Sequence, residues 1–235
     1  MTDYTISIDD IDRGTTYYYR TYVKLLDEVY YDSNVMSVTT LGAKCAYVNG
    51  HKFIDLGLPS GLLWAQRNVG ASSAYADGDY YAWGETETKS VYSYSWDYYK
   101  WYDGTNLTKY NWRDNKIILD ASDDVAAVKW GKGCRMPLQT EFQELYDKCN
   151  WTWKSNYHGT SGYLVKGPNG NSIFLPASGY FNRFGHQGSS EGSYWSATYD
   201  SRSNAHILDF SSDYVFPASM NERDLGLTVR PVAER

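Results

Sequence analysis

Hydrophobic and polar residues alternate along most of this chain in short stretches, which is the pattern of strands buried on one face. Asn49-Gly50 separates two such stretches and predicts a tight hairpin turn. Pro168-Asn169-Gly170-Asn171 predicts a second hairpin turn. The strands predicted in this way cover residues 4–8, 16–25, 33–41, 47–48, 51–56, 62–65, 162–166, 172–175, 194–198, 205–210 and 227–230.

Two segments place their hydrophobic residues at helical spacing instead. The first covers 122–130, with Ser122 as the expected N-cap, acidic residues in the first turn and Gly131 as the stop signal. The second covers 138–149. Residues 71–118 show no sustained period and are expected to form long loops. Two helices in a frame of short, mostly antiparallel strands predict an α+β domain.

Residues 1–41 differ from the rest and are expected to form a separate β module, which leaves 43–235 as the main domain. The run from Gly14 to Val23, followed by Val38-Thr39-Thr40, resembles the last three strands of a fibronectin type III domain. A complete sandwich of that type has about seven strands, and three strands alone are marginally stable. We expect this partial β-sandwich to pack on the main domain, to pair with another chain, or to be the remnant of a larger sandwich.

Composition narrows the partners that the chain can have. A formal charge of −6 argues against binding to a nucleic-acid backbone, which needs a basic face. No apolar run reaches the roughly 18 residues that a membrane-spanning helix requires, and the first residues show no signal peptide. The 24 tyrosines and 9 tryptophans are many for 235 residues, and such side chains can both fill a core and contact a ligand.

The residues that could carry chemistry are scattered. Cys45, Cys134 and Cys149 have no metal-like spacing and are expected to be buried free thiols. The four histidines are far apart and match no metal motif. The adjacent acids Asp123 and Asp124 are expected to cap a helix rather than to act as an acid/base pair. We therefore expect no enzyme activity, no metal-ligand set and no cofactor, although loop oxygens leave room for a structural Ca²⁺.

The last forty residues combine two kinds of sequence. Residues 192–198 and 226–232 contain aromatic and β-branched residues with a period of two, which is typical of scaffold strands. The stretch between them mixes aromatic, acidic and basic residues. This contrast predicts a surface that displays side chains for binding.

Six spaced motifs in the main domain support a family resemblance. Over roughly residues 43–233 the chain resembles the major paralogous domain found repeatedly in surface proteins of gut Bacteroidetes. That family is similar to the C-type lectin fold in its formylglycine-generating-enzyme variant. Cys134 and Leu138 stand where the family usually has Trp and Thr, which weakens the expected cap of the second helix. The motifs are 55–65, 81–85, Arg135-Met136-Pro137 before a helix, 175–180, Tyr194-Trp195-Ser196 and Val229-Arg230-Pro231-Val232.

The residues needed for the two activities known for this fold are missing from the sequence. Formylglycine-generating enzymes need a pair of cysteines in the C-terminal half of the domain, and this chain has none after Cys149. Sugar-binding C-type lectins hold Ca²⁺ with Glu-Pro-Asn or Gln-Pro-Asp and a later Trp-Asn-Asp, and these motifs are absent. Neither activity is expected here.

The same fold carries the variable proteins of diversity-generating retroelements, whose hypervariable region ends the chain. Adenine-rich codons in that region yield a restricted set of residues. A second aromatic and basic loop, with Tyr180, Phe181, Arg183 and Phe184, is expected to border the same surface. The alternation over 205–210 leaves open which face of that strand is core. The positions that fit the set are Tyr199, Asp200, Arg202, His206, Leu208, Asp213, Tyr214, Phe216, Ser219, Asp224 and Leu225.

These observations predict a non-enzymatic, receptor- or adhesin-like protein that binds a protein or glycan on another cell. Tyr199, Tyr214 and Phe216 are the expected anchors. The charged residues Asp200, Arg202, Asp213 and Asp224 are expected to set specificity, on a scaffold held rigid by Trp195, Arg230 and Pro231. The expected location is extracellular, on a bacterial surface or a phage tail. The protein is expected neither to insert into a membrane nor to bind nucleic acid. A homo-oligomer is compatible with the sequence.

Two alternatives stay open from the sequence alone. One is a structural or adhesin module without a discrete ligand. The other is a carbohydrate-active protein that uses aromatic loops over 92–112 as a sugar platform, which would need two facing carboxylates.

Overall fold

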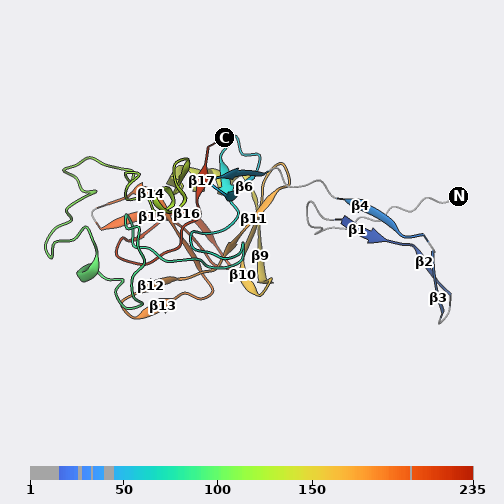
Figure 1. Cartoon of the computed structure of the whole chain (residues 1–235). Coiled ribbons are helices and arrows are strands. Elements are labelled where there is room, and N and C mark those ends of the chain that lie inside the picture. Colours follow the sequence, from blue (N-terminus) through green and yellow to red (C-terminus); the bar gives the residue numbers. More distant parts are fainter. Residues whose placement is uncertain (1–15, 26–27, 33, 40–44, 202, 235) are drawn as a thin grey trace. The chain divides into compact units, whose positions relative to one another are not determined.

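The computed structural model describes residues 16–25, 28–32, 34–39, 45–201 and 203–234. It divides into two compact units, Met1–Lys44 and Cys45–Arg235 (Figure 1). Within the described ranges it is mainly β structure, with several small antiparallel sheets and two short α-helices. The mixed α and β content predicted from the sequence is therefore confirmed at this coarse level. In the described residues no helix is long and apolar enough to cross a membrane.

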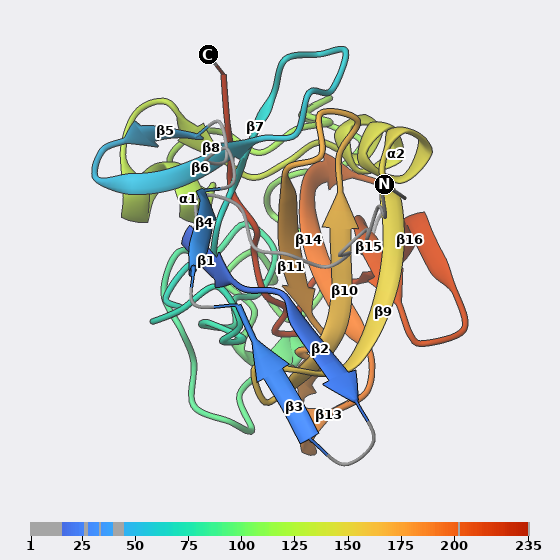
Figure 2. The ribbon, with the colours of Figure 1, turned by 90° about the vertical axis from the view of Figure 1, so that its right-hand side faces the viewer.

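The first unit is a bent two-stranded ribbon. β1 (Thr16–Tyr19) pairs with β4 (Met36–Thr39), and β2 (Tyr22–Leu25) pairs with β3 (Glu28–Tyr31). Figure 2 shows β2 and β3 following on from β1 and β4. The single strand predicted over 16–25 is thus wrong, because the chain bends between β1 and β2. The strand predicted at 4–8 lies outside the described residues.

The second unit begins with a sheet that joins distant parts of the chain. Its order is β5 (Cys45–Val48), β6 (His51–Asp55), β7 (Leu63–Ala65), β17 (Val232–Ala233) and β8 (Cys134–Arg135). Asn49 and Gly50 both have positive φ, at 50° and 81°, and connect β5 to β6. Positive φ at both positions is the geometry of a type I′ turn, so the predicted hairpin is confirmed.

Two further three-stranded sheets follow. One has the order β11 (Ser172–Pro176), β10 (Thr160–Lys166), β9 (Asn150–Tyr157), and the other has the order β14 (Gly192–Tyr199), β15 (Asn204–Phe210), β16 (Val215–Glu222). A short hairpin, β12 (Tyr180–Asn182) and β13 (Gly185–Gln187), precedes β14. β16 is an edge strand, and Pro217 lies at its bulge, a position that suits proline because the edge needs no N–H there.

The strand predicted at 227–230 is wrong. The backbone of this segment bonds to three different partners, since Tyr81 N–H donates to Leu227 O, Trp195 N–H to Thr228 O and Val69 N–H to Val229 O. Partners on three separate segments give isolated bridges rather than a ladder. The segment is nevertheless buried, as a scaffold segment should be.

Both helices occur, and the first has a different cap from the one expected. α1 (Val125–Trp130) is capped by Asp124, whose Oδ1 accepts hydrogen bonds from the N–H groups of Ala126 and Ala127 at 2.9 and 3.1 Å, so Ser122 is not the N-cap. α2 (Gln139–Lys148) has Leu138 at its N-cap position, and this residue offers no capping side chain, as expected.

Two neighbouring groups replace the missing cap of α2. Glu141 accepts a hydrogen bond from Leu138 N–H at 2.8 Å, and Thr198 Oγ1 from β14 accepts one from Gln139 N–H at 3.0 Å. The unusual Leu138 is therefore compensated locally.

The core consists of two large apolar clusters on either side of β15. Ala205 and Ile207 enter the cluster with Trp83 and Trp195. Leu208 and Phe210 enter the cluster of α2, with Phe142 and Leu145. Both faces of β15 therefore contribute to the core, whereas the alternation over 205–210 had left open which single face was buried.

Arg230 is fully buried between these elements. Its Nε donates to Asn68 Oδ1 at 2.7 Å, and its Nη atoms donate to the carbonyl oxygens of Ala65, Gln66 and Phe174 at 2.9 to 3.1 Å. No carboxylate pairs with it among the described residues. Burial lowers the pKa of this guanidinium to about 10. The predicted role of Arg230 as a scaffold residue agrees with this position.

Candidate functional site

The residues predicted to form one display surface lie at two ends of the β14–β15–β16 sheet. Tyr199, Asp200 and His206 lie at the β14–β15 connection, and Asp213, Tyr214 and Phe216 lie at the β15–β16 turn. A strand of seven residues, such as β15, spans roughly 20 Å. The two groups are therefore separate surfaces. Arg202 lies outside the described residues.

Four of the predicted positions are not freely displayed. Leu208 is fully buried, because β15 is covered on both faces, and Asp224 is only 4% exposed. Leu225 packs against the cluster of Trp83, and Ser219 is half-buried opposite Ile207. These four residues are therefore not part of the candidate surface.

The β15–β16 turn carries an exposed aromatic pair. The rings of Tyr214 and Phe216 stack with centroids 4.9 Å apart, and Phe216 is 56% exposed. The hydroxyl of Tyr214 donates to Asp209 Oδ2 at 3.3 Å, and Ser193 Oγ donates to Asp209 Oδ1 at 2.9 Å. These bonds fix Tyr214 while Phe216 faces solvent, which is the arrangement of a rigid aromatic contact site.

Burial shifts the pKa values of Asp209 and Tyr214. It raises the pKa of the Asp209 carboxyl, and the hydrogen bonds from Ser193 and Tyr214 oppose that shift. Burial, followed by the charge of Asp209, raises the pKa of Tyr214 to about 12. Tyr214 therefore remains a hydrogen-bond donor at neutral pH.

The β14–β15 end is organised by Arg223, a fully buried residue that the sequence did not single out. Its Nη2 donates to Tyr110 O at 2.7 Å and to Ser201 O at 3.0 Å. Its guanidinium also lies over the rings of Trp83 and Tyr199, at 5.1 and 4.7 Å. Tyr199 is thus held in place, which makes it a fifth predicted position that is not freely displayed. Arg223 stands between two acidic residues in a stretch assigned to the surface, so no sequence signal marked it as buried.

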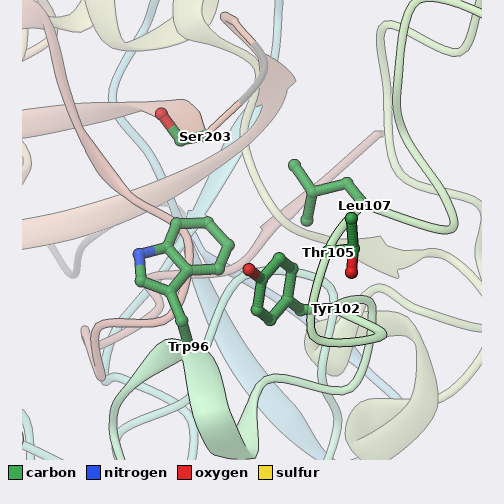
Figure 3. A pocket seen from close by; sticks show the side chains of 5 residues that line it. All are labelled: Trp96, Tyr102, Thr105, Leu107 and Ser203. Atoms are coloured by element: carbon green, nitrogen blue, oxygen red, sulfur yellow. The ribbon is translucent and has the colours of Figure 1, made fainter.

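A small pocket adjoins the β14–β15 connection (Figure 3). It has a volume of about 220 Å³ and is lined by five residues, four from the predicted loop region and Ser203 from the connection. None of the five carries a carboxylate, so the lining offers neither of the two acids that glycoside hydrolysis requires. The lining residues are Trp96, Tyr102, Thr105, Leu107 and Ser203.

The predicted bordering loop is the β12–β13 hairpin. Phe181 N–H donates to Gly226 O at 2.8 Å, and Gly226 N–H donates to Phe181 O at 2.9 Å, which places the hairpin beside the segment at 224–226. Phe181 packs on Tyr94, with ring centroids 5.8 Å apart. Phe184, by contrast, is 70% exposed, and the Arg183 guanidinium lies 4.7 Å over its ring. Of the four predicted loop residues, only Arg183 and Phe184 at the tip are exposed.

Groups that could bind metal do not converge in the described residues: no cluster of three His, Cys, Asp or Glu side chains could hold an ion. The three cysteines are free thiols, of which Cys134 is buried and Cys149 half-buried. Cys45 is exposed, so the expectation that all three are buried is wrong, because Cys45 belongs to β5 at the sheet edge.

Asp224→Asn is expected to stabilise the protein at neutral pH. Burial raises the pKa of the Asp224 carboxyl to about 6, and its Oδ1 has no hydrogen-bond partner among the described residues. The folded state therefore binds the proton more tightly than the unfolded chain, so stability from this group is lost as pH rises from about 4 to about 6. We expect a gain of about 1 to 3 kcal/mol at pH 8 and almost none at pH 4.

Urea titrations of Asp224→Asn and the original protein at both pH values measure this difference. An equal gain at pH 4 and pH 8 would contradict the assignment of a raised pKa to Asp224.

No family model matches the chain, and comparisons with curated proteins and with solved structures find no similar protein.

Proposed function

We propose that this is a non-enzymatic ligand-binding protein whose main contact surface is the β15–β16 turn. The ligand is a protein or glycan on another cell. The observation that carries the proposal is the Tyr214–Phe216 stack, in which one ring is fixed by hydrogen bonds and the other is 56% exposed. Aromatic residues held in this way supply contact area at a low entropy cost. Asp213, which is exposed in the same turn, adds charge selectivity.

The wider family assignment is part of the same proposal. The motifs described above support a C-type-lectin-like domain related to the variable proteins of diversity-generating retroelements, acting on a bacterial surface or a phage tail. A genomic observation tests the diversification directly. A reverse transcriptase gene and a near-copy of the segment encoding 192–232 should lie beside this gene; without them the proposal of diversification fails, while the binding proposal is tested separately.

Phe216→Ala and Tyr214→Ser are each expected to weaken cell binding at least about tenfold. Central aromatic residues of an interface commonly contribute about 2 kcal/mol or more to binding. Phe216 is exposed, so its loss should change the free energy of unfolding by less than about 0.5 kcal/mol. The measurement is flow cytometry of the fluorescently labelled chain on panels of intact gut bacteria and epithelial cells.

Tyr47→Ser is the matched control, because Tyr47 is 68% exposed but lies in β5, in a different sheet. It should bind cells like the original protein. If both Phe216→Ala and Tyr214→Ser keep full binding, the surface is misassigned and a structural module without a discrete ligand becomes the better explanation.

A further inference from the structure

We propose that the pocket lined by Trp96, Tyr102, Thr105, Leu107 and Ser203 binds one pyranose ring of a neutral sugar. This pocket adjoins the β14–β15 connection, whereas the Tyr214–Phe216 stack lies at the other end of β15. The two sites can therefore succeed or fail independently.

The size of the pocket limits its ligand to a single ring. Its volume is about 220 Å³, below the roughly 300 to 1,000 Å³ of pockets that bury a drug-sized ligand. A peptide helix or an extended oligosaccharide cannot be enclosed in this space, although a longer chain could continue from the bound ring into solvent.

Two aromatic rings form a corner in the pocket. The rings of Trp96 and Tyr102 have centroids 5.6 Å apart and planes inclined by 66°. Figure 3 shows them side by side, with Leu107 and Thr105 on the neighbouring loop and Ser203 coming from a different element. The faces of aromatic rings are electron-rich. They attract the slightly positive C–H groups on the apolar face of a pyranose.

Several polar groups around this corner form no hydrogen bond with another described residue. The Trp96 Nε1, Tyr102 hydroxyl and Thr105 Oγ1 have no hydrogen-bond partner among the described residues, and Ser203 Oγ has only a 3.4 Å contact to Asn204 Oδ1. Sugar hydroxyls both donate and accept, so they match a mixture of hydroxyl and N–H groups. A purely apolar ligand would leave all of these groups unused.

The charge of the site favours a neutral ligand. None of the five lining residues is charged. Two carboxyl groups are tied to the lining: the buried Asp224 carboxyl interacts with the Trp96 backbone, and Asp103 Oδ1 accepts a hydrogen bond from Thr105 N–H. Negative charges at these places disfavour phosphate or carboxylate ligands and leave a neutral sugar as the best match.

The pocket is built in advance of binding. The 3-10 helix η1 (Trp96–Tyr98) and the next turn are closed by hydrogen bonds from Tyr99 N–H to Trp96 O and from Tyr102 N–H to Tyr99 O. Asp103 Oδ1 accepts hydrogen bonds from the N–H groups of Thr105 and Asn106. Such preorganisation lowers the ordering cost of binding.

The test is saturation-transfer NMR and tryptophan fluorescence of the full chain with the methyl glycosides of glucose, galactose, mannose and N-acetylglucosamine. At least one should bind saturably with a Kd of about 1 mM, as expected for a ligand of this size. Trp96→Ala should weaken binding at least about tenfold, and Tyr102→Phe about threefold. Trp112→Ala, at a 76% exposed position outside the pocket, is the control and should bind normally.

A second variant avoids loss of packing, because Trp96 also contacts Tyr99. Thr105→Tyr fills the pocket from an exposed position and should abolish glycoside binding while the thermal unfolding curve stays unchanged. The proposal is overturned if no glycoside binds saturably, if Thr105→Tyr binds like the original protein, or if cyclohexanol binds as tightly as the sugars. Cell binding lost in Phe216→Ala but kept in Thr105→Tyr separates the two sites.

Discussion

Arg230→Ala is expected to lower the free energy of unfolding of the second unit by about 3 to 5 kcal/mol. The change removes four hydrogen bonds, to Asn68 Oδ1 and to the carbonyl oxygens of Ala65, Gln66 and Phe174. These acceptors then stay buried without donors, which costs more than the loss of a solvated contact. Arg230→Lys should recover only part of the loss, since an ammonium lacks the planar fork that reaches several carbonyls at once.

Urea unfolding followed by tryptophan fluorescence measures this effect. All 9 tryptophans belong to the second unit, so the signal reports that unit alone. Arg113→Ala is the control: Arg113 is exposed and should contribute less than about 0.5 kcal/mol. A loss below about 1 kcal/mol in Arg230→Ala would show that the guanidinium is not a structural anchor.

Arg223→Ala is expected to cost about 3 to 4 kcal/mol and, in addition, to loosen the β14–β15 connection. The guanidinium ties Ser201 O to Tyr110 O and lies over Trp83 and Tyr199. Without it, two loops that are distant in sequence lose their common donor. Ser203 O keeps its hydrogen bond from the N–H of residue 223 but lies in a loosened connection, so glycoside binding should weaken together with stability.

Amide hydrogen exchange distinguishes these two effects. Protection at Asn204, whose N–H donates to Ser201 O, should fall by more than the global loss of stability explains. Arg183→Ala is the matched control, because Arg183 also lies over an aromatic ring but is exposed at a hairpin tip. Unchanged exchange at Asn204 in Arg223→Ala would contradict the positioning role.

Local signals in the sequence predicted the local elements well. Asn49-Gly50 fixed a hairpin because few residue pairs tolerate positive φ at both positions. The helical spacing over 138–149 located α2, although Leu138 obscured its start. One of the two groups that replace the cap of that helix is Thr198, which is 59 residues away from Gln139, and no local pattern can reveal such a partner.

Burial of polar residues could not be predicted in the same way. Asp224 and Arg223 lie in a stretch whose composition is typical of a surface, yet both are buried by the loops that cover them. The pocket depends on the approach of Ser203 to the 96–107 region, a contact set by tertiary packing. The prediction that Leu208 is displayed is wrong. Because β15 is covered on both faces, alternation along the strand does not separate its buried positions from its exposed ones.

The position of β17 has a consequence for the order in which the second unit can form during synthesis. β17 lies between β7 and β8, and Ala65 N–H donates to Pro231 O. The middle of this sheet is therefore supplied by residues that leave the ribosome more than 160 positions after β7, which makes its contacts strongly non-local. Until then β8 is unpaired and β7 has one unpaired edge, since its other edge pairs with β6, so the emerging chain depends on protection from aggregation until β17 has been synthesised.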